Sequence, residues 1–116
     1  MTERHLFLAM TNPRAGMDED QFNKFYDEIH VPDVIGAPGW VAAQRYRLCS
    51  EQRFDQDPPW RYMAVYEVEL PAGEIMAALK QRPDIGPIGR PEPRPYADDD
   101  QVWIYTPIGP YQENRP

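Results

Sequence analysis

The sequence contains little cysteine and no long apolar run, and both absences restrict where the protein can work. Cys49 is the one cysteine in 116 residues, so an intramolecular disulfide and a cysteine-rich zinc cluster are excluded. The first apolar stretch begins at Leu6 and covers about six residues, which is too few for a secretory core or a membrane span. We therefore expect a cytoplasmic protein that does not enter a membrane.

Positive charge is also scarce. Twelve basic residues against nineteen acidic ones give a formal net charge of -7. This sign opposes binding to nucleic acid or to an anionic membrane surface through long-range electrostatics. Because no glycine-rich phosphate loop follows a segment with a strand pattern, nucleotide cofactors are not indicated. We expect neither a nucleic acid nor a membrane as a partner.

Histidine occurs only at positions 5 and 30. The two residues are too far apart in sequence to form a His-x-x-x-His pair, and Asp27 and Glu28 are expected to face away from His30 on a helix. We therefore predict no metal site and no cofactor. His5 is expected to be an edge or surface residue, because the ends of strands are usually hydrated.

What is present suffices for one core. Hydrophobic residues make up 41% and aromatic residues 12% of the chain, and the length fits a single domain over residues 1–116. Four segments have the alternation or the apolar content of strands. They are residues 5–12, 40–48, 62–70 and 101–106.

Helices are predicted between these strands, from Asp18 to His30 and over 72–80. The Pro- and Gly-rich stretch 82–100 is predicted to form a surface loop, and 107–116 a tail that lies across a partner or is mobile. The order strand, helix, strand, strand, helix, strand is typical of the ferredoxin-like fold. The sequence thus predicts an α+β domain with an antiparallel sheet.

The first helix has the clearest signals. Asp18 is a favourable N-cap, and Gln21 follows it at the spacing of a capping box. Pro32 is expected to end the regular helix near its last apolar position, with a short turn or an extra helical turn over residues 31–38. An apolar stripe at helical spacing ends in a histidine, and its members are Phe22, Phe25, Tyr26, Ile29 and His30.

Strict alternation assigns the residues of the second strand to two faces. Trp40, Gln44 and Tyr46 fall on one face, and Arg45 falls on the other, where it would pair with glutamates of the third strand. Both faces of the predicted sheet carry apolar or aromatic residues, whereas helices cover only one face. A second copy is expected to cover the other face, which predicts a homodimer.

The segment from Tyr26 through His30 and Pro32 to Asp33, followed by a Pro-Gly-Trp turn at 38–40, resembles the EthD-like proteins of the dimeric α+β barrel superfamily. The resemblance implies a small dimer with a pocket between helices and sheet, often without metal or organic cofactor. Members of this group include isomerases, lyases, polyketide-type cyclases and oxygenases. Because the shared fold hosts many reactions, only His30, Tyr26 and Asp33 are taken over as candidate catalytic residues.

His30 is suited to proton transfer, because the ordinary pKa of imidazole is about 6.5. Asp33 could fix its tautomer, and Tyr26 could point its hydroxyl into the same space. The alternative is a structural histidine that satisfies the last carbonyls of the helix. The first hypothesis is therefore a cofactor-independent isomerase, cyclase or lyase that acts on a small aromatic or polyketide-like carbonyl compound.

Two other functions stay open at this stage: a non-catalytic small-molecule binding or accessory protein, and a cofactor-free oxygenase. In all three cases aromatic side chains are expected to line the ligand pocket, although packing in the core or the dimer would also explain them. Asn12, after the first strand, either binds a substrate oxygen or starts a turn. The candidate substrate-binding residues are Asn12, Trp40, Tyr46, Tyr66 and Trp103.

Overall fold

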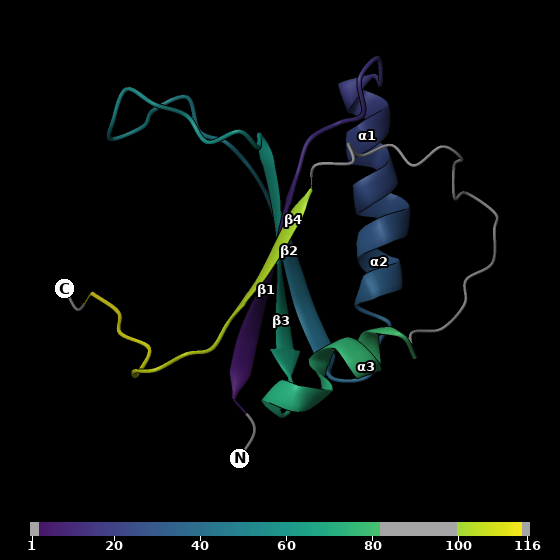
Figure 1. Cartoon of the computed structure of the whole chain (residues 1–116), viewed down its shortest axis with the longest axis vertical. Helices are drawn as coiled ribbons and strands as arrows, with labels where there is room; N and C mark the ends of the chain where they lie inside the picture. Colours follow the sequence, from purple (N-terminus) through teal and green to yellow (C-terminus); the bar gives the residue numbers. More distant parts are fainter. Residues whose placement is uncertain (1–2, 82–99, 115–116) are drawn as a thin grey trace.

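The computed structural model describes residues 3–81 and 100–114. It contains one four-stranded sheet in the order β2-β3-β1-β4, with every neighbouring pair antiparallel (Figure 1). The predicted α+β class and antiparallel sheet are confirmed, and the strand order is compatible with a ferredoxin-like fold. The strands are β1 (Arg4–Thr11), β2 (Trp40–Arg47), β3 (Tyr62–Glu69) and β4 (Gln101–Tyr105).

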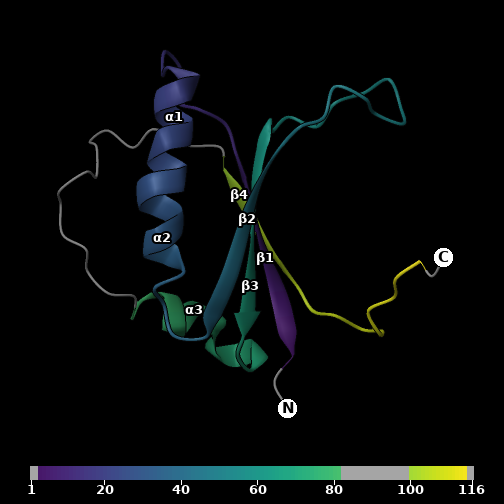
Figure 2. The ribbon, with the colours of Figure 1, turned by 180° about the vertical axis from the view of Figure 1, so that it is seen from behind.

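All the helices lie on one side of the sheet, as Figures 1 and 2 show from opposite directions. The long helical segment consists of α1 (Glu19–Phe25), a π-helical turn (Tyr26–His30) and α2 (Val31–Val34), and a 3-10 turn (Ala72–Glu74) leads into α3 (Ile75–Leu79). No helix of the described residues is long and apolar enough to cross a membrane. The predicted loop over 82–100 falls almost entirely outside the described residues.

Regular α-helix ends at Phe25, earlier than expected, and a π turn covers the residues up to His30. Of the two forms expected for residues 31–38, the structure has the extra helical turn, which is α2. Pro32 lies in the first turn of α2, and the π turn comes directly before it. In that turn the N–H of Val31 donates to the carbonyl of Tyr26, five residues back. Proline is tolerated at the start of a helix, because the N–H it lacks has no obligatory partner there. The π turn therefore lets the chain continue as helix past Pro32.

The core lies between the sheet and the helices and has two aromatic centres. In the first, the rings of Phe7, Trp40 and Tyr66 meet edge to face with centroids 4.9 to 5.8 Å apart. In the second, the ring of Phe22 on α1 lies 5.0 Å from that of Tyr62 on β3. Such pairs stabilise a core by about 0.5–1.5 kcal/mol beyond simple burial. The second centre joins helix to sheet, because the contact of Phe22 with Tyr62 holds α1 over β3.

A β-bulge at the start of β2 overturns the predicted assignment of faces. Trp40 lies opposite Val68, whereas Ala42 already lies opposite Glu67, so one extra residue stands between them. A bulge reverses the alternation of all later residues. Arg45 therefore faces the helices together with Trp40.

The expected ion pairs between β2 and the glutamates of β3 are also wrong for this reason. Arg45 lies opposite Ala64. Glu67 and Glu69 are instead on the side away from the helices, where both pair with Arg4 of β1.

His5 is buried, contrary to the expectation of a hydrated strand end. Only 2% of its surface is exposed, and its Nδ1 lies 3.0 Å from the hydroxyl oxygen of Thr106. The reason is the position of β1, which has β3 on one side and β4 on the other. A residue at the end of a central strand is covered by both neighbours.

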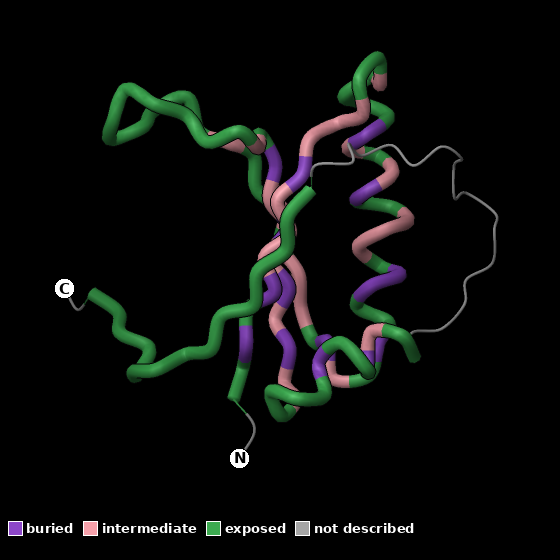
Figure 3. Tube along the Cα trace, in the orientation of Figure 1, coloured by how far each residue is buried: buried purple, intermediate pink, exposed green. Residues whose placement is uncertain are grey.

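The side of the sheet away from the helices, here called the open face, carries many apolar residues. The β2–β3 loop and the segment after β4 both extend from the sheet toward this side, and Figure 3 marks them as exposed. Phe54 of the loop and Ile108 and Tyr111 of the C-terminal segment are strongly exposed. The register places these apolar residues on the open face: Leu6, Leu8, Met10, Tyr46, Met63, Val65, Trp103 and Tyr105.

The turn before β2 depends on a glycine. Gly39 has a φ of +80°, and a Cβ there would come within 2.6 Å of Cδ2 of Leu70. Gly16 has a similar φ of +82°, but a Cβ at that position would meet open space. A comparison of the two glycines therefore distinguishes the cost of the left-handed backbone from the cost of steric overlap with Leu70.

Gly39→Ala is expected to reduce the free energy of unfolding more than Gly16→Ala does. Both substitutions introduce left-handed backbone strain of about 1–3 kcal/mol, and only the first also crowds Leu70, which adds about 1–3 kcal/mol. Urea unfolding of both variants measures the difference. Equal losses would show that Leu70 moves aside without cost.

Candidate functional site

The π turn carries two of the three candidate catalytic residues at its ends. The ring centroids of Tyr26 and His30 are 5.0 Å apart in an edge-to-face arrangement, and the ring of Phe25 stacks on His30 at 5.6 Å. The imidazole is thus held by two aromatic rings from its own helical segment. Single π turns inside α-helices are rare and are frequent at functional sites.

A cavity of about 190 Å³ lies beside His30, between the helical segment and the sheet. Its walls are mostly apolar, and its polar groups come from β1, β3, the helical segment and the residue before β4. Water is partly excluded from such a space, which strengthens electrostatic interactions inside it. The lining residues are Phe7, Ala9, Thr11, Tyr26, His30, Val34, Tyr66, Leu79, Asp100 and Val102.

Tyr66 forms part of the cavity wall from β3 and is 1% exposed. Its hydroxyl makes no hydrogen bond to any of the residues that the structure describes. Burial raises the pKa of this hydroxyl, and the positive charge of Arg45 offsets the rise only in part. The group therefore stays protonated at neutral pH and is available as a hydrogen-bond donor.

Asp33 is buried within α2 but does not line the cavity. Its predicted role, to orient His30, stays a prediction. Tyr26 is 3% exposed and contributes to the cavity wall. The structure thus brings Tyr26, His30 and Tyr66 together around one space.

The other predicted substrate-binding residues lie elsewhere. Trp40 packs in the core and does not reach the cavity, and Tyr46 and Trp103 are on the open face. The side chain of Asn12 ties the end of β1 to the residues before β3. Its amide nitrogen donates to the carbonyl of Pro59 at 2.9 Å, and its oxygen accepts from the N–H of Arg61 at 2.9 Å. Both polar atoms of Asn12 therefore serve a cross-link between two segments that are distant in sequence, which neither of the two expected roles describes.

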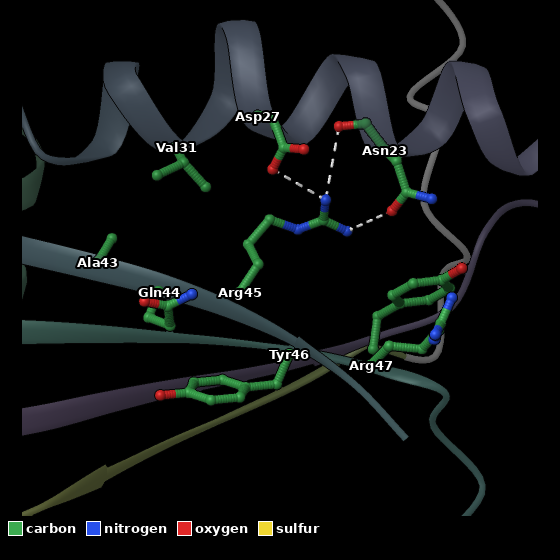
Figure 4. Close-up of a pocket in the computed structure, with 9 residues that line it drawn as sticks. Asn23, Asp27, Val31, Ala43, Gln44, Arg45, Tyr46 and Arg47 are labelled. Carbon is green, nitrogen blue, oxygen red and sulfur yellow. Dashed lines mark hydrogen bonds and ion pairs between the residues drawn. The ribbon is translucent and has the colours of Figure 1, made fainter. Parts of the chain in front are cut away.

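A second and wider hollow runs along β2 on the other side of the helical segment (Figure 4). It has a volume of about 480 Å³ and centres on Arg45, whose guanidinium lies between β2 and α1. Nη1 donates to Oδ1 of Asp27 at 3.0 Å, and Nη2 donates to Oδ1 of Asn23 at 2.9 Å. The lining residues are Asn23, Asp27, Val31, Ala43, Gln44, Arg45, Tyr46, Arg47 and Tyr62.

The guanidinium of Arg45 also lies over aromatic rings, with its carbon 4.9 Å from the centroid of Tyr26 and 5.6 Å from those of Phe22 and Tyr62. Only 15% of the side chain is exposed. A guanidinium with so many partners holds elements together. Sequence reasoning did not assign Arg45 to this place, because the bulge that turns it toward the helices has no clear sequence signal.

The two hollows differ in what they can do chemically. In the wide one the guanidinium of Arg45 is largely covered and already bonded to Asn23 and Asp27. The small one combines an imidazole with a protonated hydroxyl in apolar surroundings, which suits proton transfer. Among residues 3–81 and 100–114, no group of three or more His, Cys, Asp or Glu side chains could hold a metal ion.

No family model, curated protein or solved structure matches this chain. The likeness to EthD-like proteins therefore stays an expectation from the motif around His30.

Arg45→Met is expected to lower the free energy of unfolding by about 1–3 kcal/mol, because it removes charged hydrogen bonds and ring contacts between β2 and α1. Arg47→Met is the matched control: Arg47 lies on the same face of β2 but is exposed, and its loss should change stability by less than about 0.5 kcal/mol. Urea unfolding compares the two. A similar effect of both substitutions would contradict the role given to Arg45.

Proposed function

We propose that this chain is a cofactor-independent enzyme that uses His30 to move a proton on a small aromatic or polyketide-like carbonyl compound. The observation that carries the proposal is the position of the imidazole: it forms part of the wall of a small, mostly apolar cavity between helix and sheet. A histidine that only satisfied the end of a helix would not need such a cavity. The reaction class is isomerisation, cyclisation or elimination.

In this proposal the neutral imidazole of His30 takes a proton from the carbon next to the carbonyl. The electron pair of the broken C–H bond moves onto the carbonyl and gives an enolate. In an isomerisation the resulting imidazolium returns the proton at another position of the enolate. In an elimination the enolate breaks the bond from the β-carbon to a leaving group, which takes the proton. In a cyclisation the enolate carbon forms a bond to a second carbonyl carbon, and the imidazolium protonates the alkoxide that results. Phe25 and Tyr26 hold the ring during both transfers, and Asp33 is proposed to set its tautomer.

We also propose that the protein is a homodimer built through the open face. Trp103 and Tyr105 of β4 are 53% and 59% exposed, and apolar side chains of β1 and β3 lie beside them. A contiguous apolar sheet surface of this kind is rarely left in water by a monomer. The β2–β3 loop and the C-terminal segment extend toward the same side (Figure 1), so a second copy seated there would also contact them.

His30→Gln is expected to lower catalysed proton transfer by about 10²–10⁴-fold, the usual contribution of a positioned acid–base group. Deuterium uptake next to the carbonyl of small aromatic ketones and polyketide-like diketones, followed by NMR in D₂O, measures this step directly. Glu28→Gln is the matched control, because Glu28 belongs to the same π turn but is exposed.

Unchanged exchange in the His30→Gln protein, with its fold intact by circular dichroism, would rule out the proposed role. Ligand binding by the wild-type protein with no exchange in any compound would favour a binding or accessory protein. Oxygen consumption with a hydroquinone-like compound would favour the oxygenase.

The dimer can be tested by Trp103→Glu, which places a charge among the exposed apolar residues of the open face. Light scattering should give twice the chain mass of 13.5 kDa for the wild-type protein and the monomer mass for this variant, because an unpaired charge is costly in an apolar interface. Met76→Glu is the control, since Met76 of α3 is comparably exposed on the helical side. A monomeric wild-type protein would contradict the proposal.

A further inference from the structure

Tyr66 is a polar residue of the cavity wall that has no role in the proposed proton transfer. Its hydroxyl is buried and makes no hydrogen bond within the described part of the chain. Buried hydroxyls are almost always paired, because leaving one unpaired costs the free energy of its lost hydration. An unpaired donor in a cavity wall therefore indicates a ligand atom as its partner.

Tyr62 shows how a buried tyrosine is satisfied in the same strand. It lies four residues before Tyr66 on the same face of β3, and its hydroxyl donates to Oε2 of Glu19 at 2.9 Å. Tyr62 does not line the cavity. The two residues share chemistry, strand and burial, and they differ in whether a protein group accepts the hydroxyl proton.

The position of Tyr66 is well fixed. Its ring meets Phe7 at 5.8 Å and Trp40 at 5.7 Å between centroids, both edge to face. Because burial raises its pKa, the hydroxyl donates a hydrogen bond and does not carry a negative charge at neutral pH. A fixed, protonated donor in apolar surroundings is the arrangement that stabilises a growing negative charge on oxygen.

We propose that Tyr66 donates a hydrogen bond to the carbonyl oxygen of a single-ring ligand held in the cavity beside His30. The volume of about 190 Å³ sets the size, since a cavity of about 150 Å³ is known to hold benzene. The inference rests on the proposed function. When His30 removes the proton next to the carbonyl, charge grows on the oxygen that Tyr66 binds, so this hydrogen bond is stronger in the transition state than in the bound ligand.

The binding test uses two probes of nearly equal shape, acetophenone and α-methylstyrene, of which only the ketone has an acceptor oxygen. The wild-type protein should bind the ketone about tenfold more tightly, which corresponds to one hydrogen bond. Infrared spectra of the bound ketone should show a lowered carbonyl stretching frequency. Tyr66→Phe should lose both the preference and the shift, and Tyr62→Phe should keep both.

A preference that survives in Tyr66→Phe would overturn the assignment. So would a wild-type protein that binds the two probes equally well or binds neither.

The melting temperature distinguishes a hydroxyl that donates to a ligand from a hydroxyl that stabilises the fold. Tyr66→Phe should melt at the same temperature as the wild-type protein or higher, because it removes a hydroxyl with no partner. Tyr62→Phe should melt lower, because it breaks the bond to Glu19. A clear fall in the melting temperature of Tyr66→Phe would show that its hydroxyl serves the fold and would overturn the proposal.

Failure of this inference and failure of the proposed function can be told apart with the same ketone. His30→Gln should abolish deuterium exchange into the methyl group of acetophenone but keep the preference for it over α-methylstyrene. A Tyr66-dependent preference without exchange in the wild-type protein would leave the hydrogen bond in place and refute proton transfer. Exchange that depends on His30 but not on Tyr66 would refute the hydrogen bond alone.

Discussion

The contact on which the rest of the structure depends is the one between the guanidinium of Arg45 and the helical segment above it. This group bonds to the side chains of Asn23 and Asp27 and lies over the ring of Tyr26. Because Tyr26 begins the π turn and its ring meets the edge of His30, one buried cation on β2 sets where the imidazole stands above the sheet. Arginine suits this place better than lysine, because its planar guanidinium can donate several hydrogen bonds and stack on a ring at the same time.

Arg45 faces the helices only because of the irregular backbone at the start of β2. The turn at Gly39 brings the chain into the sheet, and the bulge after Trp40 then inserts one residue. Without that residue Trp40 would keep its place in the core, but Arg45 would lie on the open face. The tie to the helix and the place of Tyr46 on the open face therefore have the same local cause.

The periodic features of the sequence predicted the parts of the fold that depend on burial. The stripe from Phe22 to His30 follows the helical period, the strands follow their alternation, and the order of elements follows from both. The bulge and the π turn each shift the register by one residue, and neither leaves a periodic signal. This is why Arg45 was assigned to the wrong face and the π turn was not foreseen. His5 was misjudged because the burial of a strand end depends on which strands become its neighbours.

The same limits explain how far the site could be predicted. Tyr26 and His30 share a helix, so their proximity follows from spacing alone. Tyr66 lies near Tyr26 and His30 because β3 pairs with β1. The alternation within β3 is compatible with this pairing but does not identify β1 as the neighbour.

Each strand of the sheet carries residues of both faces, so the proposed dimer interface and the proposed site share the same backbone. Along β1 the residues His5, Phe7, Ala9 and Thr11 face the helices, and the apolar residues between them belong to the open face. Along β3, Val65 of the open face is the direct neighbour of Tyr66. A second copy packed on the open face would restrict the backbone that carries Tyr66, because neighbouring residues of a strand share one rigid backbone unit. In the proposed dimer, burial of the open face would thus help to hold the ring of Tyr66 in its place in the cavity wall.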